Sequence, residues 1–163
     1  MLRSGKDYLR ALQDGRRIFI GGRQIEDVTP HSAFRNAAQS FARLYDMKRE
    51  QESLLSYEAD GARHSFYFKQ PRTEADLKFR MRGHKAWADA SYGLFGRSPD
   101  HVGAFVTGMT CKPEVFDVPE HGFKGNLLAF YRRIRDNDLY VTYATHPPHG
   151  ARNAATRPDR DHH

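Results

Sequence analysis

The pattern of apolar and polar residues has a helical period along most of the chain. Apolar side chains recur every three or four residues in a series of segments, which is typical of amphipathic helices with one buried face. Most of these segments follow residues suited to begin a helix, such as a hydroxyl that caps free backbone N–H groups. The expected starts are Ser4, Thr29-Pro30-His31, Thr73 with Asp76 in capping-box position, Ser98-Pro99 and Phe123.

The same spacing predicts which face of each helix is buried. In the long helix after Thr29 the apolar stripe consists of Phe34, Ala37, Ala38, Phe41, Leu44 and Tyr45. After Thr73 it consists of Leu77, Met81, His84, Ala88 and Tyr92, and after Ser98 of Val102, Phe105, Val106 and Met109. The last helix would span 123–135. The sequence therefore predicts a core built mainly between helices.

Two shorter stretches predict β-hairpins. Gly21-Gly22 lies between the runs 17–20 and 23–25, and Asp60-Gly61 separates two further runs that favour strands, 54–58 and 64–68. Glycine tolerates the positive φ that a tight hairpin turn requires. The fold class expected from the pattern is thus mainly α with two small β-hairpins.

The end of the chain has a different character. Residues 139–145 are rich in β-favouring side chains and predict a single strand, whose partners would lie outside this sequence. Residues 153–163 contain no large apolar side chain and are expected to be disordered.

Composition narrows the function classes. The chain has 163 residues, of which 39% are hydrophobic, enough for one domain with a core. The net charge is +6, but acids are interleaved with bases, so nucleic-acid binding is not favoured. One cysteine, Cys111, excludes an internal disulfide and a thiolate metal site, and no metal site is expected. Without an apolar run long enough for a bilayer, we expect a cytoplasmic protein with no membrane partner.

Several extended strings, in order and at similar spacing from about residue 4 to 152, resemble the 4-hydroxyphenylacetate 3-monooxygenase oxygenase family. They are 6–20 (KDYLRALQDGRRIFI), 28–38 (VTPHSAFRNAA), 42–46 (ARLYD), 91–100 (SYGLFGRSPD) and 139–144 (LYVTYA). The resemblance implies a fold like that of acyl-CoA dehydrogenases, with an N-terminal helical domain, a middle β-barrel and a C-terminal helical bundle.

On this resemblance, residues 1–138 are the N-terminal helical domain and 139–152 are the first barrel strand with the flavin-side loop. Family members are considerably longer, so we expect a fragment that is inactive alone. The family uses reduced FAD, delivered by a separate flavin reductase, to transfer one oxygen atom to the ring of a phenol. The implied partners are a phenolic substrate, the reductase, the missing barrel and bundle, and further copies in a homo-oligomer.

The resemblance also implies the site residues. Arg97 matches an arginine that contacts the phenolic substrate; otherwise it would be an exposed arginine paired with Asp100. His101 stands where the family usually has a tyrosine on the same oxygen, and Tyr143 stands where 4-hydroxyphenylacetate hydroxylases have a histidine. These departures favour a phenol other than 4-hydroxyphenylacetate. The flavin-side positions are Tyr143, Ala144, Thr145 and Pro148.

Other interpretations stay open at this point. A small basic helical module could bind a partner subunit or nucleic acid without any catalytic activity. A frameshifted gene product would also account for the polar end of the chain. The related hydroxybutyryl-CoA dehydratases use an iron–sulfur cluster, which needs several cysteines where this chain has Cys111 alone.

Overall fold

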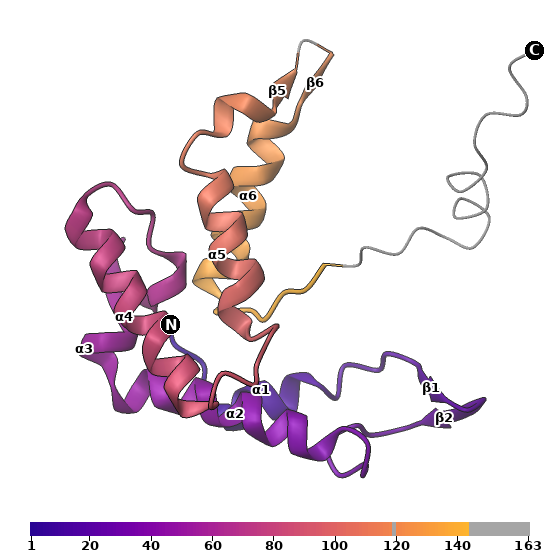
Figure 1. Ribbon diagram of the computed structural model, residues 1–163. Helices are drawn as coiled ribbons and strands as arrows, with labels where there is room; N and C mark the ends of the chain where they lie inside the picture. The colour runs from indigo at the N-terminus through magenta and orange to yellow at the C-terminus, as the bar shows by residue number, and fades with distance from the viewer. Residues whose placement is uncertain (119, 144–163) are drawn as a thin grey trace, which may run out of the picture.

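A computed structural model describes residues 1–118 and 120–143. Within them the chain is mainly helical, with three two-stranded antiparallel hairpins (Figure 1). The α-helices are α1 (Gly5–Ala11), α2 (Arg35–Glu50), α3 (Glu52–Leu55), α4 (Glu74–Ala90), α5 (Pro99–Met109) and α6 (Phe123–Asp136). The 3-10 helices are η1 (Phe66–Phe68) and η2 (Pro113–Phe116). The hairpins pair β1 (Ile18–Ile20) with β2 (Arg23–Ile25), β3 (Ser56–Ala59) with β4 (Ala62–Ser65), and β5 (Asp117–Val118) with β6 (His121–Gly122).

Capping boxes begin two of the predicted helices. The Ser4 hydroxyl accepts a hydrogen bond from the backbone N–H of Asp7, whose carboxylate accepts one from the backbone N–H of Ser4. Thr73 and Asp76 make the same reciprocal pair at the start of α4. Each pair satisfies backbone donors that would otherwise lack partners in the first turn. The predicted starts of α1 and α4 are confirmed.

Helix α2 begins later than the sequence predicted. Its first residue is Arg35, and the preceding residues form a turn in which the His31 carbonyl accepts from the N–H groups of Phe34 and Arg35. Thr29 is held in the turn before it, because its N–H and its hydroxyl both donate to Asp27. Pro30 therefore does not lie in the first turn of α2, and the expected start of this helix at 29–31 was wrong.

The two predicted hairpins are confirmed, and the structure adds a third. The turn of the second hairpin has the positive φ angles expected of it, 53° at Asp60 and 72° at Gly61. Its second strand ends at Ser65, and the chain continues as η1 instead of a longer strand. The β5–β6 hairpin has two residues in each strand, too few for an alternating pattern to be visible in the sequence.

The core is centred on the aromatic run of η1. Phe66, Tyr67 and Phe68 have no exposed surface. The Phe66 ring meets the rings of Tyr67 and Trp87 edge to face, with centroids 5.2 and 5.3 Å apart. Helices α4 and α5 pack against this run, and Tyr131 of α6 contacts Phe68. Figure 1 shows these three helices. The burial of such large rings contributes strongly to the stability of the core.

The predicted buried face of α4 was wrong. Leu77, Met81 and Tyr92 are 56%, 64% and 89% exposed. The buried residues of the helix are Gly83 and Trp87, because the Phe66 ring packs directly on the backbone at Gly83. Helical periodicity alone predicted that the larger apolar side chains of α4 would be buried. The core instead packs against Gly83, which has no side chain.

On α5, Val102 and Val106 are buried as expected, but Phe105 is 65% exposed.

Among the described residues, no helix combines the length and the apolar content that a bilayer crossing requires.

Residues 139–143 pair with no other strand within the described part of the chain. After α6, Asp138 adopts a positive φ of 48°, and the N–H of Leu139 donates to the Ile134 carbonyl. The segment then packs by side chains, with Leu139, Tyr140 and Val141 against the helical cores. The strand predicted at 139–145 was expected to pair with strands outside this sequence, so it stays a prediction; residues 144–152 and the predicted disordered tail 153–163 lie outside the described residues.

Candidate functional site

The loop that carries Arg97 links α4 to α5. Tyr92 and Gly93 adopt left-handed backbone conformations with φ of 53° and 70°, which turn the chain away from the end of α4. Pro99 then stands at the first position of α5, directly after the N-cap residue Ser98. The loop is therefore fixed by a helix at each end.

The structure brings the three predicted substrate residues together. The ring centroids of His101 and Tyr143 are 5.9 Å apart, and the Arg97 guanidinium carbon lies 5.4 Å from the Tyr143 ring centroid. The three side chains come from the α4–α5 loop, the first turn of α5 and the segment after α6. All three are exposed, Tyr143 by 43%. A guanidinium, an imidazole and a phenol hydroxyl therefore share one accessible surface, and their action on a substrate stays a prediction.

Tyr140 connects two parts of this site, and the sequence analysis missed it. Its hydroxyl donates a 2.7 Å hydrogen bond to the backbone carbonyl of Arg97. Its ring lies 5.1 Å from that of Phe41, which in turn stacks on Phe95 at 5.1 Å. Phe95 therefore packs against the core. Tyr140 ties the Arg97 loop to the segment that carries Tyr143.

Asp100 does not pair with Arg97. Its carboxylate accepts from the Ser98 hydroxyl and lies 2.5 Å from Nδ1 of His84. Burial alone would raise the pKa of Asp100, but the hydrogen bonds from His84 and Ser98 outweigh it, so the pKa lies below its ordinary value. Within the described residues the Arg97 guanidinium makes no ion pair, which leaves its donors available to a ligand.

The carboxylate of Asp100 should make stability depend on pH. Because its pKa is lower in the folded protein than in the unfolded chain, its contribution is present above pH 3.8 and is lost as the pH falls through the lowered value. We expect the Asp100→Asn variant to lose less stability than the parent protein in this acid range. Chemical denaturation at a series of pH values measures this. Asp89→Asn, at an exposed position on α4, controls for the loss of one carboxylate; equal slopes for Asp100→Asn and the parent would contradict the prediction.

A fully buried ion pair fixes the start of the segment that carries Tyr143. Lys48 Nζ lies 2.6 and 2.8 Å from the two carboxylate oxygens of Asp138, and both side chains are essentially inaccessible. The Ser65 hydroxyl and the backbone N–H of Arg3 also donate to this carboxylate. Burial lowers the pKa of Lys48 to about 8, although the charge of Asp138 opposes the shift. No local pattern indicated this pair, because its members are 90 residues apart.

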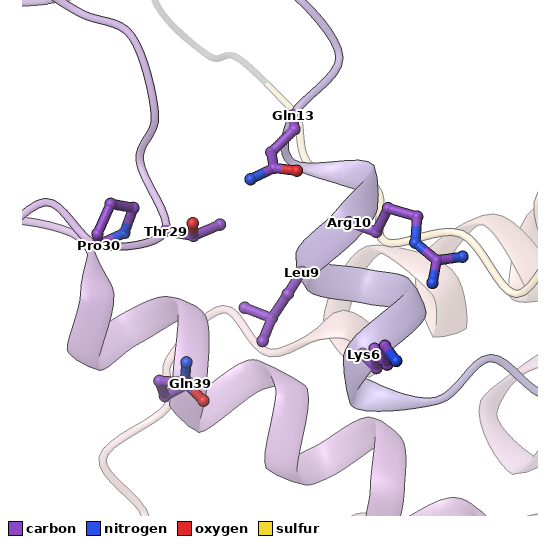
Figure 2. Close-up of a pocket in the computed structure, with 7 residues that line it drawn as sticks. All are labelled: Lys6, Leu9, Arg10, Gln13, Thr29, Pro30 and Gln39. Carbon is purple, nitrogen blue, oxygen red and sulfur yellow. The ribbon is translucent and has the colours of Figure 1, made fainter.

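The expected flavin-side positions are mostly beyond the described residues. Ala144, Thr145 and Pro148 lie outside them, and Tyr143 is the one that can be placed. A separate open pocket of about 470 Å³ lies between α1 and the first part of α2 with the segment before it. Figure 2 shows the residues that line it. There Leu9 points toward Pro30 and Gln39, while Arg10 points away (Figure 2). None of the three candidate site residues lines this pocket.

Comparison with known proteins identifies the family. The family model described as 4-hydroxyphenylacetate 3-hydroxylase N terminal matches residues 4–163. The oxygenase component of 4-hydroxyphenylacetate 3-monooxygenase from Thermus thermophilus is 35% identical over 98% of this chain and 33% of its own length. The 4-nitrophenol 2-monooxygenase oxygenase component of a Rhodococcus species is 34% identical over 89% of this chain and 28% of its own length.

Solved structures agree with this assignment. A crystal structure of the oxygenase component of 4-hydroxyphenylacetate 3-monooxygenase, complexed with FAD and 4-hydroxyphenylacetate, superposes with a TM-score of 0.85 at 35% identity. The match covers 96% of this chain and 33% of that one. An archaeal 4-hydroxybutyryl-CoA dehydratase shares the fold at a TM-score of 0.69 and 19% identity, over 86% of this chain and 28% of its own.

The chain spans about a third of the length of the curated relatives that it matches. The matched third is the N-terminal one by the description of the family model, and the mainly helical fold with small hairpins agrees with it. On the ordered match along nearly the whole sequence, this chain belongs to the 4-hydroxyphenylacetate 3-hydroxylase family, in its N-terminal region.

Proposed function

We propose that this chain is the substrate-side domain of a reduced-FAD-dependent phenol hydroxylase of a two-component monooxygenase system. The relatives named for hydroxylation of 4-hydroxyphenylacetate and 4-nitrophenol both act on phenols. The family match gives no support to the alternative of a small basic binding module. The role proposed for this chain is to hold the phenol oxygen beside the flavin.

The observation that carries the proposal is the Arg97 guanidinium, which makes no ion pair within the described residues and lies beside two other hydrogen-bonding groups. A phenol becomes a better nucleophile as its oxygen gains negative charge. A guanidinium always carries its charge and offers several donors, so it stabilises a phenolate oxygen. On this proposal the imidazole of His101 and the hydroxyl of Tyr143, whose rings are neighbours, would contact the same ligand.

Reduced FAD, supplied by a flavin reductase, would provide the oxygen chemistry. Tyr143 fits a position at the boundary between substrate and flavin, because its ring is flanked by Arg97 and His101 and is 43% exposed. Beyond Tyr143, the residues proposed for the flavin are Ala144, Thr145 and Pro148. We expect weak FAD binding and no hydroxylation by the chain alone, since the relatives are about three times as long; stoichiometric FAD on the purified chain would contradict this.

The phenol site can be tested with 4-nitrophenol, whose ionised form is yellow. We expect the chain to bind it with an increase in yellow absorbance, and Arg97→Ala to weaken binding about tenfold or more, because a charge-assisted hydrogen bond is lost. Absorbance titration and NMR of the chain measure both effects. Arg132→Ala removes an exposed arginine from α6 and is the matched control. Equal affinity of Arg97→Ala and the parent would refute the role of Arg97.

A further inference from the structure

Two of the hairpins carry apolar side chains that the rest of the described chain does not cover. All of residues 19–24, at the end of the β1–β2 hairpin, are exposed, including Phe19 by 56% and Ile20 by 40%. At the β5–β6 hairpin, Val118 is 46% exposed, and Phe123 directly after the hairpin is 51% exposed. The two hairpins lie at different ends of the helical body (Figure 1). Apolar groups on a short hairpin are stabilised when a partner covers them.

The β1–β2 hairpin is positively charged. Residues 15–24 contain three arginines and no acid. Arg16 pairs with Asp14, whereas Arg17 and Arg23 are exposed and make no ion pair within the described residues. Arg23 stands opposite Ile20 in the strand register. This end of the molecule therefore presents cationic and apolar groups together.

The β5–β6 hairpin has the opposite charge. Residues 113–122 contain three acids and no lysine or arginine. A carboxylate oxygen of Glu114 lies 3.4 Å from Nζ of Lys124, whereas Asp117 and Glu120 are exposed and form no ion pair in the described part of the chain. Val118 follows Asp117 in the same strand. Anionic and apolar groups therefore meet at this end.

We propose that copies of this chain associate head to tail, with the β1–β2 hairpin of one copy docked on the β5–β6 hairpin of the next. The arginines of the first hairpin then meet the acids of the second, and the exposed apolar groups of the two hairpins cover each other. A contact between two β1–β2 hairpins would bring like charges together, which costs free energy. The favoured contact is therefore heterologous, and each copy keeps one hairpin of each kind for a further neighbour. The proposal does not depend on the hydroxylase function.

The contact is small, because the strands of the two hairpins have three and two residues. We expect a dissociation constant on the order of 0.1 mM, as for weak interfaces below the standard size. The charges are exposed and screened by salt, so the dissociation constant should rise roughly tenfold between about 0.02 and 0.5 M salt. Sedimentation equilibrium of the whole chain, from about 0.01 to 1 mM, measures both effects.

Charge reversal provides the decisive comparison. Arg17→Glu/Arg23→Glu and Asp117→Lys/Glu120→Lys should each stay monomeric alone, because the two hairpins of each variant then have the same sign of charge. An equimolar mixture of the two variants should associate again, because the first supplies an acidic β1–β2 hairpin and the second a basic β5–β6 hairpin. Unfolding of either variant cannot produce this recovery.

Matched controls reverse the same number of charges away from the hairpins. Arg132→Glu/Arg133→Glu on α6 and Glu74→Lys/Asp89→Lys on α4 alter exposed residues and should associate like the parent. Phe19→Ser removes the largest apolar group of the first hairpin and should weaken association severalfold. A parent chain that stays monomeric at low salt up to the highest concentration overturns the proposal. So does a mixture of the two hairpin variants that stays monomeric, or a pair of controls that dissociate as fully as those variants.

Discussion

Replacing Lys48 with methionine is expected to destabilise the fold by about 3–5 kcal/mol, the largest effect of any single substitution considered for this chain. Methionine fills a similar volume to lysine, so the loss of stability comes from removal of the Lys48 charge. The Asp138 carboxylate would remain with 1% of its surface exposed and without its counter-ion. The remaining donors from Ser65 and Arg3 cannot neutralise it. Chemical denaturation of the parent and the variant measures the difference.

The double variant Lys48→Met/Asp138→Asn separates charge from packing. Asparagine tolerates the positive φ at 138 and is neutral, so the double variant should be more stable than Lys48→Met alone. Arg43→Met breaks the exposed pair of Arg43 with Glu50 on the same helix and should change stability far less. If Lys48→Met is as stable as Arg43→Met, the buried pair does not hold the fold as inferred.

Local patterns were sufficient for the parts of the fold that depend on neighbouring residues. The capping residues Ser4 and Thr73 and the Asp60-Gly61 turn act over three or four positions, and each was found where the sequence predicted. The buried face of α4 depends instead on how Phe66 packs on Gly83, a contact between elements. Helical periodicity depends only on where the apolar side chains lie along the sequence. It cannot predict that the Phe66 ring packs against the backbone of a glycine such as Gly83.

The residues of the candidate site also fall into two groups, those that could be predicted from the sequence and those that could not. Arg97, His101 and Tyr143 came from a resemblance, and the structure places them together. Tyr140 was missed because its hydroxyl bonds a backbone carbonyl, an acceptor that every residue offers and that leaves no sequence signal. The Lys48–Asp138 pair was missed because a lysine on an amphipathic helix usually faces solvent.

Gly103 and Gly108 on α5 are expected to respond to alanine with opposite signs. A Cβ at Gly103 would lie 2.7 Å from Cδ2 and 2.8 Å from Cε2 of the buried Tyr67 ring, closer than real contacts allow. Tyr67 has no exposed surface and is packed on Phe68, with ring centroids 4.5 Å apart, so it has little room to move. We expect Gly103→Ala to destabilise the protein by about 1–3 kcal/mol through overpacking.

Gly108 has no atom within 4 Å of the corresponding Cβ position and is exposed on the same helix. There alanine restricts the unfolded backbone and favours the helix, so Gly108→Ala should stabilise by roughly 0.5–1 kcal/mol. Urea denaturation of the two variants and the parent measures both changes. Because helix propensity is the same in both substitutions, the difference between them isolates the contact with Tyr67. A stabilised Gly103→Ala would mean that the Tyr67 ring is free to shift, and that η1 does not form the rigid centre of the core.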